Sequence, residues 1–144
     1  MGENDTSSSL PVMIYNYLDD SLKDIADNIW NAQMAGWPNI LTYIYRPKAD
    51  KGVLRRKTLG LVPRIQSRDE YPFASTLENE GSVWVGHASV AQQNAQGSLI
   101  SKFYQENGAY KKGTTFRFEV KVINHPKGPV TPVQRLSGAP SRLS

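Results

Sequence analysis

A chain of 144 residues with 39% hydrophobic and 21% charged residues has the composition of one globular domain. Its formal net charge of +4 and pI of about 9.4 are compatible with binding a polyanion but do not require it. The chain has no cysteine, which excludes disulfides, thiol nucleophiles and thiolate metal sites, and its apolar runs are too short for membrane insertion.

The first third of the chain predicts a strand and a helix. Residues 1–10 are polar and acidic, do not resemble a secretory signal, and are expected to be disordered. Residues 11–17 are apolar and aromatic enough for a first strand. Potential N-cap residues at 19–21 precede apolar residues at helical spacing, so we expect an amphipathic helix over residues 21–35.

A second strand is predicted over residues 40–46, and the densest positive charge of the chain follows it. Arginine and lysine side chains bind phosphate oxygens, so this patch is a candidate for holding a nucleic-acid backbone. A solvated helix face is an equally acceptable explanation of a charge run. The patch and the loop after it contain Lys51, Arg55, Arg56 and Arg64.

The second half of the chain predicts two more strands and a long helix. Residues 83–90 are expected to form a strand that carries His87, either as a structural hydrogen bonder or as a catalytic acid or base. Residues 92–107 predict a helix that ends at a glycine, and residues 114–123 alternate clearly as a strand. Residues 124–144 are rich in proline and glycine and are expected to be an irregular tail.

These elements predict an α+β domain over residues 11–123, in which a short antiparallel β-sheet packs with two main helices. At its centre, Asp69 and Glu70 stand between Arg68 and a Tyr-Pro step. Proline restricts the preceding residue to extended geometry, so the two carboxylates should leave a strand on a stiff path, as a functional site requires. A solvated turn is the alternative explanation.

The stretch from Arg68 to Thr76, together with several motifs before and after it, resembles the NucA/NucB-type deoxyribonuclease family. The resemblance includes Glu78, Gln96-Gly97, Phe103-Tyr104, the strand at 116–120 and, upstream, Asp27-Asn28-Ile29, Ala35-Gly36-Trp37-Pro38, Ala49-Asp50-Lys51 and Arg55-Arg56. It covers roughly residues 12–122. It implies a deoxyribonuclease domain of the kind that also forms the toxin domain of larger effectors.

The resemblance also implies roles for individual residues in a ββα-metal-like active site. Asp69 would be the general base, while Glu70 and Glu78 would hold or orient a divalent cation, with Mg or Mn as the expected metals. The family's second motif carries an acidic residue followed by Asn or Gln, and these two positions correspond to Gln92 and Gln93, which are therefore further candidate metal ligands here. Because the acid is absent, His87 or Gln93 would take over part of its work, or the protein is a weakened variant.

The resemblance therefore implies metal-dependent, largely sequence-nonspecific hydrolysis of DNA phosphodiester bonds by an antibacterial toxin domain that is secreted or delivered as an effector. DNA is the expected partner, held by the basic patch together with Arg68, and an inhibitory immunity protein is a second one. The alternative is a catalytically impaired module on the same scaffold that binds nucleic acid or protein, which the amide at Gln92 favours.

Overall fold

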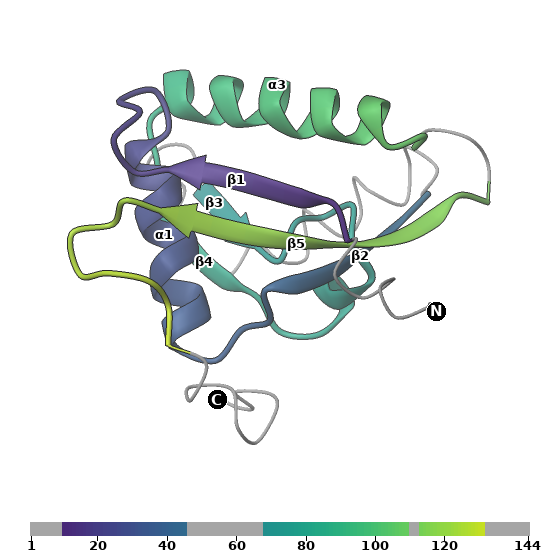
Figure 1. Cartoon of the computed structure of the whole chain (residues 1–144), viewed down its shortest axis with the longest axis horizontal. Helices are drawn as coiled ribbons and strands as arrows, with labels where there is room; N and C mark the ends of the chain where they lie inside the picture. Colours follow the sequence, from purple (N-terminus) through teal and green to yellow (C-terminus); the bar gives the residue numbers. More distant parts are fainter. Residues whose placement is uncertain (1–9, 46–67, 110–112, 132–144) are drawn as a thin grey trace.

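The computed structural model describes residues 10–45, 68–109 and 113–131 and confirms the α+β class (Figure 1). In chain order, the elements are β1 (Val12–Asn16), α1 (Lys23–Met34), β2 (Ile40–Ile44), β3 (Arg68–Tyr71), the 3-10 helix η2 (Leu77–Glu80), β4 (Trp84–His87), α3 (Val90–Glu106) and β5 (Thr115–Ile123).

The strands form two separate units. β1, β5 and β2 make a three-stranded sheet in that order, and β3 pairs with β4 in an antiparallel hairpin. The larger sheet is mixed, because β1 runs parallel to β5 whereas β2 runs antiparallel to it. β5 confirms the predicted alternation, since Phe118, Val120 and Val122 are buried while Arg117 and Lys121 are exposed. The central strand therefore presents one apolar face to the core.

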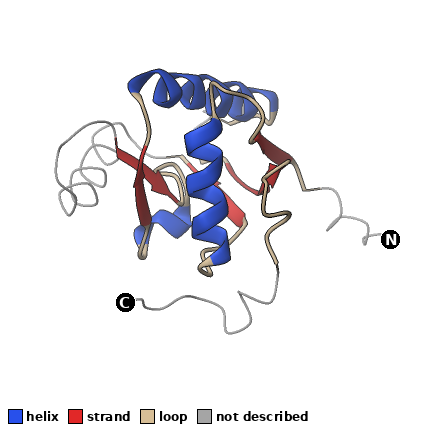
Figure 2. Cartoon of the chain, turned by 90° about the vertical axis from the view of Figure 1, so that its left-hand side faces the viewer, coloured by secondary structure: helices blue, strands red, loops and turns tan. Residues whose placement is uncertain are grey.

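The two helices cover the core from different directions. α1 packs against the hairpin, the larger sheet and α3, and α3 lies crosswise over one end of α1 (Figure 2). Helical spacing places the apolar residues of α1 on one buried stripe, as expected from the sequence. This stripe comprises Ile25, Ala26, Ile29, Trp30 and Ala32. The hairpin, the larger sheet and α3 thus all pack around α1.

The ends of two elements differ from the predictions. The expected N-cap of α1 at residues 19–21 is wrong: Asp19 Oδ1 accepts hydrogen bonds from the amide and hydroxyl of Ser21 in a local turn, and the N-cap position is Leu22. The strand expected over residues 83–90 ends at His87. Ser89 is instead the N-cap of α3, where its hydroxyl accepts the Gln92 amide at 3.1 Å.

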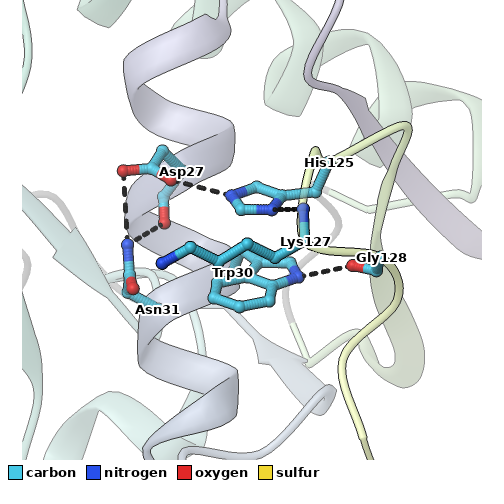
Figure 3. A network of polar contacts seen from close by, with 6 residues as sticks. All are labelled: Asp27, Trp30, Asn31, His125, Lys127 and Gly128. Carbon is cyan, nitrogen blue, oxygen red and sulfur yellow. Dashed lines mark hydrogen bonds and ion pairs between the residues drawn. The ribbon is translucent and has the colours of Figure 1, made fainter.

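The segment after β5 contains no helix or strand up to residue 131, but it packs on α1 through His125 (Figure 3). The His125 ring stacks on Trp30, with 4.1 Å between centroids and an interplanar angle of 1°. Its Nδ1 accepts the backbone amide of Lys127 at 3.1 Å, so Nε2 carries the proton and donates to Asp27 Oδ1 at 2.8 Å. Trp30 Nε1 donates to the carbonyl of Gly128 at 2.8 Å. The start of the tail is therefore part of the folded domain.

The chain's two histidines allow a matched test of this packing. His125→Ala removes a buried ring, its stacking and its hydrogen bonds, so it should lower the free energy of unfolding by roughly 1–3 kcal/mol. His87 is exposed, so His87→Ala should change it by less than about 0.5 kcal/mol. Urea denaturation measures both. Equal effects of the two substitutions would contradict the proposed docking of the segment.

Candidate functional site

The predicted carboxylates lie on the β3–β4 hairpin, where they face opposite sides. Asp69 stands opposite Gly86, and Glu70 stands opposite Val85. Since neighbouring side chains of a strand alternate, Asp69 is directed toward α1 and Glu70 away from it. Both are buried, with 3% of Asp69 and 6% of Glu70 exposed. The two carboxylates therefore lie on opposite faces of the hairpin and cannot bind one ligand together.

Asn28 of α1 meets Asp69 directly. Its Nδ2 donates to Asp69 Oδ2 at 3.1 Å and to the backbone carbonyl of His87 at 3.0 Å. One amide thus joins α1 to both strands of the hairpin. This contact holds the Asp69 carboxylate against α1.

Tyr15 of β1 lies near the same carboxylate. Burial is the main cause that raises the pKa of the Tyr15 hydroxyl well above its usual value of 10.0, and the charge of Asp69 raises that pKa further. The hydrogen bond from Gln96 Nε2, at 3.3 Å, acts in the opposite direction. Burial and the neighbouring carboxylate thus both favour the neutral form of the Tyr15 hydroxyl.

The other two predicted acidic residues make contacts elsewhere. Asn79 of η2 donates to Glu70 Oε1 at 3.2 Å and to the carbonyl of Pro72 at 2.8 Å. Both carboxylate oxygens of Glu78 accept hydrogen bonds from Thr42, one from its amide at 2.7 Å and one from its hydroxyl at 2.9 Å. Glu78 therefore connects η2 to β2 and is not directed toward Asp69 in this structure.

Gln92 and Gln93 stand in the first turn of α3 and make structural hydrogen bonds. Gln92 Oε1 accepts the backbone amides of Asp24 at 2.7 Å and Ile25 at 3.3 Å. It thus supplies the capping acceptor that α1 lacks locally. Gln93 Nε2 donates to the carbonyl of Arg68 at 3.0 Å, which joins α3 to β3.

The capping contact yields a stability prediction. Gln92→Ala should lower the free energy of unfolding by about 1 kcal/mol, because two amides in the first turn of α1 lose their acceptor. Gln92→Glu should retain or exceed wild-type stability, since a carboxylate accepts the same bonds and its charge is favourable at a helix N-terminus. Chemical denaturation at low salt measures this order. A Gln92→Glu protein that is as unstable as Gln92→Ala would contradict the capping role.

Only some of the predicted DNA-binding and catalytic side chains with basic groups lie within the described residues. Arg68 and His87 are opposite each other at one end of the hairpin, and His87 is exposed. The remaining predicted DNA-binding residues, Lys51, Arg55, Arg56 and Arg64, lie outside the described residues.

The predicted metal ligands do not fit a cation as one set. Glu70, Glu78, Gln92 and Gln93 each contact a different element, as described above. Within residues 10–45, 68–109 and 113–131, no three His, Cys, Asp or Glu side chains come close enough to hold a metal ion together. Their oxygens are the donor type that Mg and Mn prefer, but the arrangement is not a ligand cage.

Asn28, the partner of Asp69, had no predicted role beyond its place in the Asp27-Asn28-Ile29 stretch of the family resemblance. The available signal was its position: Asn28 follows the buried Ile25 by three residues and precedes the buried Ala32 by four. A polar amide at that spacing borders the apolar stripe of the helix and needs a partner on the element it packs against.

The fold and the site together define an α+β domain in which a strand hairpin, followed by a helix, holds a buried carboxylate against a second helix. Residues 46–119 match the family described as Deoxyribonuclease NucA/NucB, and this range includes β3, β4, α3 and the first half of β5. The chain belongs to this family and is thus of the nuclease class, with DNA as the implied substrate.

Comparison with curated proteins found no match. The helices within the described ranges are all too short or too polar to cross a membrane.

Proposed function

We propose that this chain hydrolyses DNA phosphodiester bonds as an endonuclease with little sequence preference, and that Asp69 is the residue on which the reaction depends. The observation that carries the proposal is the family match over residues 46–119, because that range contains Asp69 and the complete hairpin–helix unit around it. The amide contact from Asn28 further supports Asp69, since it fixes the carboxylate in one orientation.

Phosphodiester hydrolysis needs an activated water and positive charge or hydrogen-bond donors near the non-bridging oxygens. In our proposal Asp69 takes the proton of the attacking water. Arg68 and His87, at one end of the same hairpin, are suited to binding the phosphate and to proton transfer respectively. Because only 3% of Asp69 is exposed, the attacking water has to be held close to the carboxylate rather than exchanged freely with solvent.

Asp69→Asn tests the proposed general base, because it keeps the shape of the side chain and an oxygen that can accept from Asn28. Loss of a general base should lower the rate of plasmid nicking by roughly 10²–10⁴-fold, with the fold intact by circular dichroism. Asp20→Asn is the matched control, since the side chain of Asp20 is 95% exposed and its ion pair at 3.9 Å is with Lys23, the first residue of α1. Asp69→Asn activity within threefold of wild type would remove Asp69 from the mechanism.

The family relationship also supports dependence on a divalent metal, with Mg or Mn as the proposed ion, although the described residues form no ligand cage for it. Nicking should cease when the protein is treated with a chelator and return when either metal is added. Unchanged nicking in the chelator would contradict metal dependence while leaving the nuclease class in place.

A second candidate function is a catalytically impaired module that binds nucleic acid. It is favoured by Gln92, because the family's acidic position is here an uncharged amide engaged in capping α1. Such a protein would retard plasmid DNA on a gel without nicking it in the presence of either metal. Nicking by the wild-type chain that Asp69→Asn abolishes would exclude this alternative.

We extend the proposal to the biological setting: a secreted or delivered effector domain that acts as an antibacterial toxin and is neutralised by an immunity protein. The support for it is the resemblance to toxin domains of the same family. Expression of the wild-type chain inside bacteria should then arrest growth, whereas Asp69→Asn should not.

A further inference from the structure

We propose that Asn28 is the positioning residue of this nuclease: it fixes the rotamer of Asp69 and the end of β4 through one side-chain amide, and Gly86 is required to leave room for it. This inference rests on the proposed function, since positioning has a catalytic consequence only if Asp69 takes part in the reaction.

The hydrogen bonds define what Asn28 does. Its Nδ2 carries two protons and donates them to two acceptors, Asp69 Oδ2 at 3.1 Å and the carbonyl of His87 at 3.0 Å. Because the two acceptors belong to different strands, both are satisfied only when the hairpin sits in one place against α1. The amide therefore aligns the carboxylate and the backbone of His87 relative to each other.

Gly86 supplies the second, independent observation. This glycine stands opposite Asp69 in the hairpin. A Cβ at Gly86 would lie 2.6 Å from Asn28 Oδ1, 2.7 Å from Cγ and 2.9 Å from Nδ2. All three distances are shorter than real contacts of a methyl group, so the Asn28 amide occupies the space that any other residue at position 86 would need.

The same geometry shows what an alanine at position 86 would do. The colliding atoms are the end of one flexible side chain, so the amide can turn away without unfolding the protein. Turning away breaks its hydrogen bonds to Asp69 and His87. Gly86→Ala thus disconnects Asn28 from the site without changing Asn28 itself.

Catalytic groups must be held within a fraction of an ångström of their working geometry, and misplacement by about 1 Å can cost about 10²-fold in rate. We therefore expect Asn28→Ala and Gly86→Ala each to lower kcat by roughly 10- to 100-fold, with KM for DNA changed by less than about threefold. Well below the unfolding temperature nearly all of each variant is folded, so a loss of stability alone would leave kcat unchanged.

The combined variant is the sharpest test. In the Asn28→Ala background the amide is absent, and the new methyl group at position 86 has nothing to displace. Gly86→Ala should then lower kcat by less than about twofold beyond Asn28→Ala alone. Multiplicative effects of the two substitutions would overturn the inference, because they would show that Gly86 and Asn28 act separately.

Two control variants separate this from general effects of such substitutions. Gly97→Ala adds a methyl group in α3, where nothing lies within 4 Å of the new atom, and it should leave kcat unchanged. Asn31→Ala removes an amide one turn further along α1, whose partners are the carbonyl and carboxylate of Asp27, and it should also leave kcat unchanged. A fall in kcat of tenfold or more in either control would contradict a role specific to Asn28.

A spectroscopic readout distinguishes failure of this inference from failure of the proposed function. The side-chain amide signals of Asn28 are assigned as those that vanish from the nitrogen–proton NMR spectrum of Asn28→Ala. These protons should be protected from solvent exchange in the wild type and should lose that protection in Gly86→Ala. If the wild-type chain does not cleave DNA, the proposed function fails, and with it the catalytic consequence. Unprotected Asn28 amide protons in the wild type would overturn the positioning role whether or not DNA is cleaved.

Discussion

Helix α1 is held in place by side-chain hydrogen bonds from nearly every element around it, and the rest of the structure depends on this constraint. Gln33, only 2% exposed, donates to the Tyr71 hydroxyl at 3.0 Å and to the carbonyl of Val120 at 3.0 Å, so it joins the hairpin to the larger sheet. Asn28 joins the same helix to both strands of the hairpin. Buried polar groups that are satisfied in this way specify one arrangement of the packed elements.

Two residues from later parts of the chain, Gln92 and His125, reinforce this arrangement. Gln92 of α3 caps the start of α1, and the stacked His125 fixes the segment after β5 along the same helix. Neither contact belongs to the local sequence of α1. The hydrophobic stripe determines which face of α1 is buried, whereas these polar contacts fix the position of the helix along its axis. Because Asp69 is hydrogen-bonded to Asn28 of α1, the position of the helix also fixes the position of Asp69.

Local patterns predicted the elements well and their long-range contacts poorly. The alternation of Phe118, Val120 and Val122 identified β5 and its buried face, because each side chain reports its own environment. The predicted cap of α1 was wrong since the actual acceptor, Gln92, is 68 residues away from Asp24. Likewise, the strand predicted over residues 83–90 included Ser89, and nothing in its local pattern could show that the Ser89 hydroxyl caps α3.

The same distinction applies to the site. The Asp-Glu dipeptide and the family resemblance indicated Asp69 from the sequence alone, but pleating places its neighbour Glu70 on the other face of the hairpin. Parallel pairing of β1 with β5 and the contact between Asn28 and Asp69 involve residues far apart in the chain, and the latter also depends on the missing Cβ of Gly86. Such contacts have no local signature in the amino-acid sequence.

The central claim is that DNA is hydrolysed at Asp69, where α1 meets the β3–β4 hairpin. A crystal structure of the chain with a cleavage-resistant phosphorothioate duplex tests it most directly. The account predicts a phosphate of the DNA backbone one water molecule away from Asp69, roughly 5 Å from its carboxylate, with the Asn28 contact retained. DNA bound to another face of the domain, with Asp69 still buried and no phosphate near it, would contradict the account.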